Sequence, residues 1–194
     1  NIIHRNQFDT IYHEHLSYFL LKPLIRLFDS CDMKIFKVEE YDIHGGSIRI
    51  YAARKSYPET MWNSEIIPSQ SECAYEEDVS VRDMKQFEEV NGLYQFETYK
   101  DYAEKVQDIK DHFVSLMEDL KRQRKKVVGY GASAKGIMFL NACNMDSSYI
   151  EAIIDDTKAK QGKYVPGCFI PIVSADYFEI NHPDYILLLS WNFS

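Results

Sequence analysis

Gly129-Tyr130-Gly131-Ala132-Ser133-Ala134 is the stretch of this chain that decides its fold. The apolar residues before it predict a strand over residues 126–129, and the helical spacing after it predicts a helix over residues 134–142. A G-x-G-x-x-A pattern between a strand and a helix is typical of doubly wound α/β domains. In such domains the first glycine permits a tight turn, the second lets the backbone approach a pyrophosphate, and the small sixth residue permits close helix packing. The stretch therefore predicts a parallel α/β domain with a phosphate-binding turn.

The turn offers several groups to an anionic ligand. Backbone N–H groups at Gly129, Gly131 and Ala132, together with the dipole of the following helix, favour a phosphate. Ser133 adds a hydroxyl donor. Lys135 places a cation in the first helical turn, where the dipole disfavours it unless a ligand phosphate is present. A tight strand–helix turn without a ligand is the structural alternative.

A second group of polar residues follows the next predicted strand, residues 149–154. Asp155 and Asp156 stand where doubly wound domains hold a carboxylate against a ribose hydroxyl. Lys160 and two neighbouring lysines place three cations near the same edge, where they would help to bind a doubly charged pyrophosphate. A solvated basic loop is the alternative. NAD, a nucleoside-diphosphate sugar and coenzyme A all suit such a turn, so the motif alone does not name the ligand.

The remaining periodicity places this domain after a hairpin and several helices. A buried strand is predicted over residues 185–189, and the alternation of strands and helices implies a parallel sheet with helical crossovers. Upstream, the pattern predicts a helix that starts near Lys22, followed by an antiparallel hairpin and two more helices. The hairpin strands span residues 34–41 and 47–53, one helix spans residues 79–90, and the other carries an apolar stripe over residues 99–120. We interpret that stripe as core packing rather than as a cofactor site.

The composition excludes several classes of function. The formal charge of -8 leaves no strong field for nucleic acid or an anionic membrane. The dense basic run over residues 121–126 is interpreted as a solvated helix end, because cations favour a helix C-terminus. No apolar run approaches the ~20 residues of a membrane span, and the four cysteines form no C-x-x-C pair. These features predict a cytoplasmic protein without a zinc site or a disulfide scaffold, whose partner is neither nucleic acid nor a membrane.

Four titratable side chains stand together in Tyr12-His13-Glu14-His15. A histidine can act as a general base near neutral pH, a carboxylate beside it can raise its basicity, and a tyrosine hydroxyl can donate to a developing oxyanion. Metal ligation is a weaker interpretation, because H-E-H lacks the i, i+4 spacing of H-E-x-x-H and no cysteine lies nearby. A polar loop with capping histidines is the third interpretation.

Taken together, these stretches resemble the nucleotide-sugar C-methyltransferases. The resemblance runs from end to end of the chain and is weakest in the helical connector. Its clearest parts are residues 7–18 (QFDTIYHEHLSY), 44–49 (HGGSIR), 129–136 (GYGASAKG), 155–164 (DDTKAKQGKY) and 187–193 (LLLSWNF).

The resemblance implies a domain organisation and an activity. Enzymes of this family have a small N-terminal zinc-binding domain, a class I methyltransferase domain and a Rossmann-like C-terminal domain, and they methylate a sugar ring carbon next to a keto group in dTDP-linked deoxysugars. By this resemblance, residues 1–56 are the tail of the methyltransferase domain, whose sheet the hairpin closes. Residues 57–125 are a mainly helical connector, and residues 126–194 form the nucleotide-sugar-binding domain. We therefore expect the zinc cysteines and the donor-binding loop upstream of Asn1, and an inactive isolated chain.

The resemblance also assigns roles to single residues. His15 would be the base that removes the proton α to the sugar carbonyl, with Glu14 and Tyr12 orienting the base or stabilising the enolate. Ser133 and Lys135 would hold the pyrophosphate of the dTDP-sugar. S-adenosylmethionine would be the methyl donor in the complete enzyme. Two alternatives stay open: an NAD-dependent oxidoreductase built on the glycine-rich turn, and a non-catalytic nucleotide-binding module.

Overall fold

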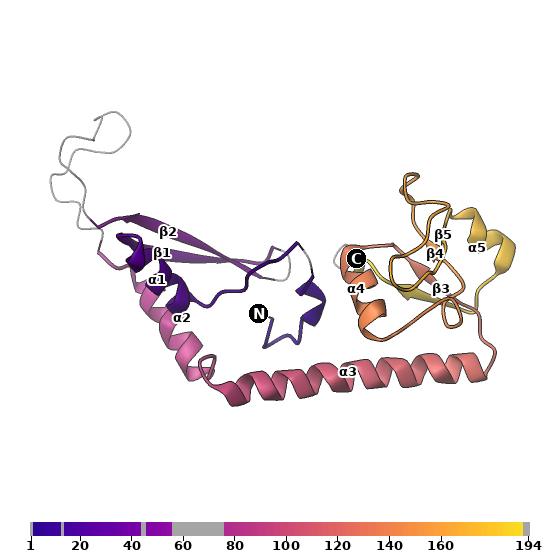
Figure 1. Cartoon of the computed structure of the whole chain (residues 1–194), viewed down its shortest axis with the longest axis horizontal. Helices are drawn as coiled ribbons and strands as arrows, with labels where there is room; N and C mark the ends of the chain where they lie inside the picture. The colour runs from indigo at the N-terminus through magenta and orange to yellow at the C-terminus, as the bar shows by residue number, and fades with distance from the viewer. Residues whose placement is uncertain (1, 13, 44–45, 56–75, 192–194) are drawn as a thin grey trace. The chain divides into compact units, whose positions relative to one another are not determined.

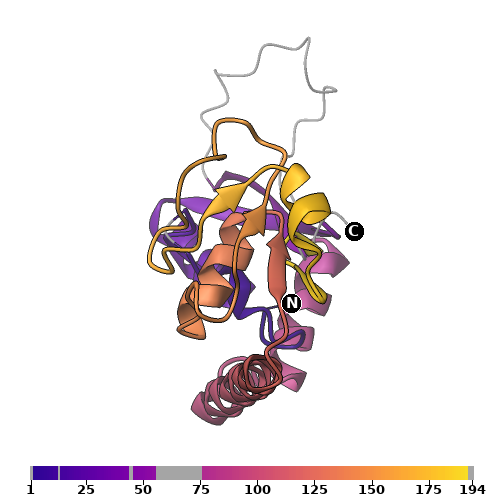
Figure 2. The same ribbon diagram turned by 90° about the vertical axis from the view of Figure 1, so that its right-hand side faces the viewer.

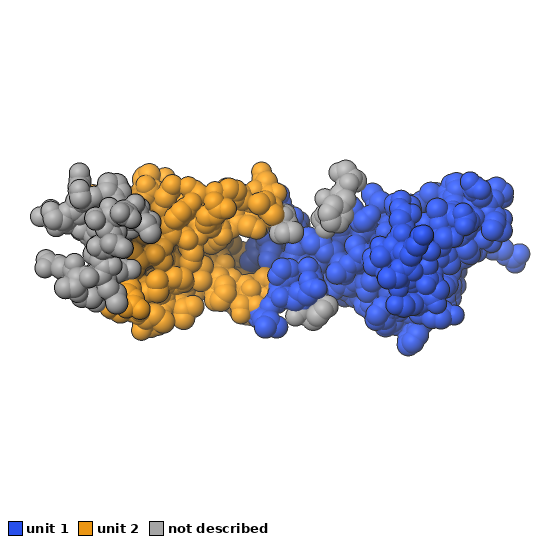
Figure 3. All heavy atoms as spheres, turned by 90° about the horizontal axis from the view of Figure 1, so that it is seen from above, with its two compact units in different colours: residues 1–16, 100–194 blue, residues 17–99 orange. Residues whose placement is uncertain are grey.

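The computed structural model describes residues 2–12, 14–43, 46–55 and 76–191, which form two compact units. Unit 1 consists of Asn1–Leu16 and Lys100–Ser194, and unit 2 is Ser17–Tyr99 (Figure 3). The chain thus enters unit 2 after Leu16 and leaves it after Tyr99, inside the long helix α3 (Phe96–Arg122). In the described ranges, no helix is both long and apolar enough to cross a membrane.

Unit 2 is a two-stranded antiparallel sheet with helices packed on it (Figure 1). Its elements are α1 (Leu21–Ser30), β1 (Met33–Tyr41), β2 (Ser47–Arg54) and α2 (Val79–Val90). Their core consists of Leu21, Leu24, Ile35, Val38 and Val81. The hairpin and both helices were predicted from the sequence, and the structure confirms them.

A buried carboxylate joins the two helices of unit 2. Glu88 is only 4% exposed, and its carboxylate accepts hydrogen bonds from the backbone amides of Leu21 (2.6 Å) and Lys22 (3.4 Å). The hydroxyl of Tyr94 also donates to Glu88. Since the first N–H groups of a helix have no acceptor inside it, Glu88 supplies one for α1 from another helix. Pro23, in the same first turn, is tolerated there because its missing N–H costs nothing.

Unit 1 contains a four-stranded parallel sheet, which Figure 2 turns toward the viewer. The order of its strands is β5-β4-β3-β6. The elements are β3 (Val127–Tyr130), α4 (Ala134–Ala142), β4 (Ile153–Ile154), β5 (Ile172–Val173), α5 (Asp176–Asn181) and β6 (Tyr185–Leu188), with a short 3-10 helix, η1 (Phe8–Thr10), from the start of the chain. The predicted fold class, α/β with a parallel sheet after an antiparallel hairpin, is confirmed.

The core of unit 1 lies between the sheet, α4 and the end of α3. Val127, Leu140 and Ile153 are buried together with Met117 of α3, and Phe113 and Leu120 pack against them. The predicted stripe on α3 is therefore core packing at this end of the helix. Nearer the N-terminus of α3 the residues of the stripe are more exposed to solvent; Ile109, for example, is 38% exposed.

Three details of unit 1 differ from the sequence-based prediction. The strand predicted over residues 149–154 is a strand only at Ile153–Ile154, because the amides of Tyr149 and Ile150 bond back to the Asp146 carbonyl in a turn. Neither β5 nor α5 was predicted. The crossover from β4 to β5 consists of turns, so helical crossovers occur only between β3 and β4 and between β5 and β6.

Candidate functional site

The glycine-rich turn is shaped by close packing inside unit 1. Gly131 has a φ of 83°, which favours glycine, and a Cβ atom there would lie 2.5 Å from the Ser190 hydroxyl oxygen. At Gly129 a Cβ atom would lie 2.9 Å from the side chains of both Ile153 and Leu189. Contacts within the chain thus require both glycines, whether or not a ligand binds the turn.

Ser133 begins α4 and fixes its position against β6. Its hydroxyl accepts a hydrogen bond from the Gly136 amide (3.0 Å) and donates one to the Leu189 carbonyl (2.5 Å). As the N-cap, Ser133 satisfies one amide of the first turn. The helix supplies no acceptors for the N–H groups of Ala134 and Lys135, which belong to the same turn. This end of α4 therefore keeps the chemistry of an anion site.

Asp155 is part of an internal network beneath the turn. Its side chain is 8% exposed and accepts hydrogen bonds from the amides of Ala132 (2.8 Å) and Thr157 (2.9 Å) and from the Lys160 ammonium (2.9 Å). Lys160 also donates to the Ala132 carbonyl at 2.9 Å. Burial acts to raise the pKa of Asp155, but the hydrogen bonds from Thr157, Lys160 and Ala132 outweigh it and hold the pKa below its usual range. Asp155, Lys160 and Ala132 thus bind one another, and their predicted role in ligand binding stays a prediction.

A small pocket lies at the carboxyl ends of the strands. It has a volume of about 220 Å³. It is lined by Tyr130 at the end of β3 and Gly131 after it, by Ile154 at the end of β4 and residues 155–157 after it, and by Ser190 after β6. The Tyr130 hydroxyl donates to the Asp156 carboxylate at 3.2 Å. The charge of Asp156 and this hydrogen bond raise the pKa of Tyr130. We call this feature the acidic pocket; sequence reasoning did not single out Tyr130 or Ser190, which belong to it only through the fold.

The segment that carries the predicted base packs against α4. Asp9 of η1 forms an ion pair with Lys135 at 3.7 Å, and the two side chains are only 12% and 13% exposed. The rings of Phe8 and Phe139 lie 5.7 Å apart. Lys135, whose place in a first helical turn seemed to require a phosphate, therefore has an anionic partner within the chain. No local sequence signal indicated Asp9, because it contacts a helix far along the sequence.

The predicted catalytic residues lie on one turn after η1. The backbone amide of His15 donates to the Tyr12 carbonyl at 3.0 Å. This turn brings the Nε2 atom of His15 within 3.2 Å of the Tyr12 hydroxyl, with the ring centroids 4.8 Å apart and edge-on. Glu14 and His15 are exposed. His13 lies outside the described residues, as do His44 and Gly45 of the resemblance.

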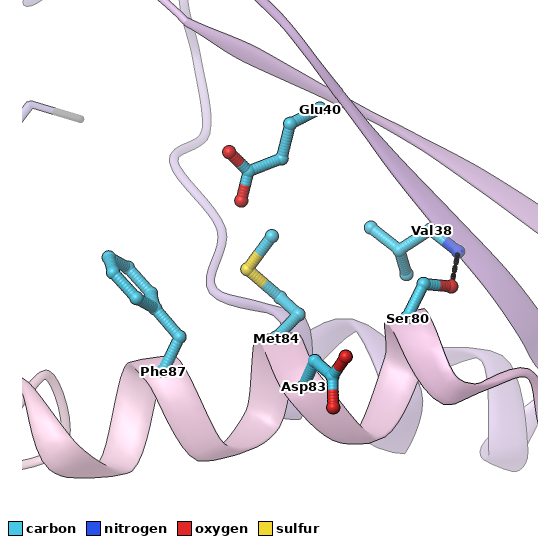
Figure 4. A pocket seen from close by; sticks show the side chains of 6 residues that line it. All are labelled: Val38, Glu40, Ser80, Asp83, Met84 and Phe87. Carbon is cyan, nitrogen blue, oxygen red and sulfur yellow. Dashed lines mark hydrogen bonds between the residues drawn. The ribbon is translucent and has the colours of Figure 1, made fainter.

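A larger pocket, of about 440 Å³, lies in unit 2 and holds none of the predicted site residues. Figure 4 shows Met84 and Phe87 on α2 and, opposite them, Val38 and Glu40 on β1. The Ser80 hydroxyl, also on α2, accepts a hydrogen bond from the Val38 amide at 3.1 Å. The size of this pocket does not make it the functional site, because neither the glycine-rich turn nor the predicted base lies there. The described part of the chain contains no group of three or more His, Cys, Asp or Glu residues that could hold a metal ion.

Comparison with known proteins gives two findings. A family model described as "C-methyltransferase C-terminal domain" matches residues 42–194. The C-methyltransferase NovU of Streptomyces niveus is 35% identical over 193 residues. That alignment covers 100% of this chain but 42% of the relative, so the chain spans less than half the length of the curated protein it matches.

Proposed function

Because this chain belongs to the C-methyltransferase family, as a C-terminal portion of it, we propose that it forms the substrate-handling part of a sugar C-methyltransferase. The proposed substrate is a dTDP-linked deoxysugar with a keto group, which is methylated at the neighbouring ring carbon. The proposed methyl donor is S-adenosylmethionine. The formal charge of -8 disfavours nucleic acid and an anionic membrane as partners.

One observation carries this proposal: the segment with the predicted base is held on the helix that begins at the glycine-rich turn. The Asp9–Lys135 ion pair and the Phe8–Phe139 contact both join that segment to α4. A nucleotide sugar is long enough to place its diphosphate at one group and its sugar ring at another. Holding base and phosphate site in one compact unit is the preorganisation that proton transfer requires.

We assign proton removal to His15. A neutral imidazole takes the proton from the carbon next to the keto group, and the electron pair of the broken C–H bond moves to the carbonyl oxygen as an enolate. The Nε2 atom of His15 lies 3.2 Å from the Tyr12 hydroxyl. This hydroxyl can therefore either orient the imidazole or turn to donate to the enolate oxygen. Glu14 follows in the same turn. A positioned base contributes roughly 10²–10⁴-fold to such a step.

We assign diphosphate binding to the first turn of α4. The backbone amides of Ala134 and Lys135 supply the donors there. The predicted donors at Gly129 and Gly131 are corrected by the structure, because their amides donate to the carbonyls of Ala152 and Ile154. The Ser133 hydroxyl donates to the Leu189 carbonyl. Lys135 already pairs with Asp9, and the amide of Ala132 already bonds to Asp155. A phosphate that uses either group must therefore compete with a carboxylate of the chain.

In the described part of the chain, only residues 129–134 form a glycine-rich turn of the G-x-G-x-x-A type. That turn is assigned to the diphosphate, and its Gly131 also lines the acidic pocket, whereas the larger pocket in unit 2 contains no such turn. We therefore assign no residue to S-adenosylmethionine and derive no step through it.

The test of the base uses a protein that carries this chain together with its donor-binding part. His15→Asn should reduce turnover by at least about 10²-fold while dTDP affinity stays unchanged. His182→Asn is the matched control, because His182 has a φ of 45° at the end of α5 and asparagine tolerates that conformation. Turnover that survives in His15→Asn contradicts the base assignment.

The test of the ligand uses calorimetry on the chain itself. We expect dTDP to bind and NADH not to bind. Binding of NADH without dTDP would favour an oxidoreductase instead.

A further inference from the structure

The acidic pocket lies where the topology of the sheet favours a ligand. In the order β5-β4-β3-β6 the chain proceeds from β3 to one side and then returns to place β6 on the other. The strand order therefore reverses between β3 and β6. Ligands of open α/β sheets bind outside the carboxyl ends of the strands at such a switch point. Residues following β3, β4 and β6 all line the acidic pocket.

The charge of this pocket selects against a phosphate. Asp155 and Asp156 both face it, and among the residues that line it neither a lysine nor an arginine is present. The two carboxylates have different roles, however. Asp155 binds the amides of Ala132 and Thr157 and the ammonium of Lys160. Asp156 is exposed and accepts from the Tyr130 hydroxyl at 3.2 Å.

The size and position of the acidic pocket suit one part of a nucleotide. A volume of about 220 Å³ is below the roughly 300–1,000 Å³ of pockets that hold a whole drug-sized ligand, so one moiety fits. Gly131 belongs both to this pocket and to the turn that leads into α4. A ligand whose phosphates bind the first turn of α4 thus has its next group beside Asp156.

We infer that the acidic pocket takes the deoxyribose of the nucleotide, with Asp156 accepting a hydrogen bond from its 3′-hydroxyl and Tyr130 beside it, while the diphosphate stays outside at α4. This inference rests on the proposed function, and it gives to Asp156 alone the role that the sequence suggested for Asp155 and Asp156 together. It predicts opposite responses: loss of the Asp156 charge should weaken binding of the nucleotide and should not weaken binding of bare pyrophosphate.

Calorimetry on the chain with three probes tests this: dTDP, its 3′-deoxy analogue and inorganic pyrophosphate. Asp156→Ala should weaken the affinity for dTDP by about tenfold or more, because a hydrogen bond to a charged group is lost. It should leave the 3′-deoxy analogue unchanged and leave pyrophosphate equal or tighter. Glu179→Gln is the control, since it removes one exposed carboxylate of unit 1 away from the pocket.

Each outcome decides one question. If the unmodified chain binds dTDP but Asp156→Ala binds it equally well, or loses dTDP and the 3′-deoxy analogue to the same degree, the pocket assignment is wrong and the proposed function stands. If the unmodified chain binds neither dTDP nor pyrophosphate, the proposed nucleotide site itself is wrong, and the assignment of the acidic pocket falls with it. Because Asp156 is exposed, a thermal unfolding curve suffices to show that the variant is folded.

Discussion

Replacing Asp155 with alanine tests the network beneath the glycine-rich turn. The change removes the acceptor of three donors. The amide of Ala132 is buried, so leaving it unsatisfied costs about 1–3 kcal/mol. The amide of Thr157 belongs to an exposed residue and can bond to water, which limits that loss to about 1 kcal/mol. The Lys160 side chain is 42% exposed, and a pair of this kind contributes about 0–1 kcal/mol. Together they predict a destabilisation of unit 1 of about 3 kcal/mol.

The assay is thermal unfolding followed by tryptophan fluorescence. The chain has two tryptophans, so Trp62→Phe leaves Trp191 as the single reporter. Trp191 packs against the core of unit 1 and lies 6.2 Å from the Phe139 ring. For a chain of this size about 3 kcal/mol corresponds to a decrease in Tm of roughly 6–12 °C. Asp156→Ala is the matched control and should change stability by no more than about 0.5 kcal/mol, because Asp156 is exposed.

The dependence on pH gives a second readout. The folded-state pKa of Asp155 lies below its ordinary value, so the unfolded chain binds the proton more readily. The stabilisation by the carboxylate is therefore complete above about pH 4 and is lost as the pH falls through the folded value. The difference in stability between the two proteins should be constant from pH 7 to 5 and shrink below that. A Tm of Asp155→Ala within 1 °C of the parent, or an equal loss in Asp156→Ala, would refute the reasoning.

Three further predictions concern single positions. Gly131→Ala should destabilise the protein more than Gly162→Ala in urea unfolding, since both have positive φ but only the Cβ at Gly131 meets a neighbour within 4 Å; equal losses would contradict the steric argument. Tyr94→Phe should lower the free energy of unfolding by about 1–2 kcal/mol in the same assay, because the buried Glu88 carboxylate loses a hydrogen-bond donor. An unchanged midpoint would show that water replaces the hydroxyl. Glu39 should titrate near pH 2 by carbon-detected NMR, since hydrogen bonds from Lys37, Tyr41 and Tyr51 and the lysine charge lower its pKa to about 2; a midpoint near 4 would contradict this.

The spacing of apolar residues predicted two helices with the bounds that the structure gives them. The predicted bounds 79–90 and 134–142 are those of α2 and α4. Asp78 accepts from the Ser80 amide, and Ser133 accepts from the Gly136 amide. Each cap is formed by residues close together in the sequence, and it supports the helix start that the apolar spacing had predicted.

Two short elements of unit 1 were missed. The strand β5 has two residues. The helix α5 has six and follows Ala175, whose side chain makes no capping bond. Pairing with β4, rather than propensity, makes residues 172–173 a strand. Such pairing depends on residues far apart in the chain and leaves no periodic pattern in so short a segment.

The candidate site could be predicted as a set of residues but not as a set of contacts. The turn, Asp155 and Lys135 were identified by type and position. Their partners within the chain, such as Asp9 for Lys135, arise from tertiary packing and could not be inferred. The roles of these residues in binding stay predictions, and the variants above test them.

Unit 1 is assembled from two separated pieces of the chain, and this constrains the order in which the protein can fold during synthesis. The ribosome makes η1 before any of unit 2, whereas α4, which carries Lys135 and Phe139, emerges later than all of it. Unit 2 is continuous, so it can complete its own core first. Closing the chain across an inserted unit costs entropy that grows only slowly with its length. Attachment of the segment that precedes His15 must therefore wait until unit 2 and α4 have both been synthesised.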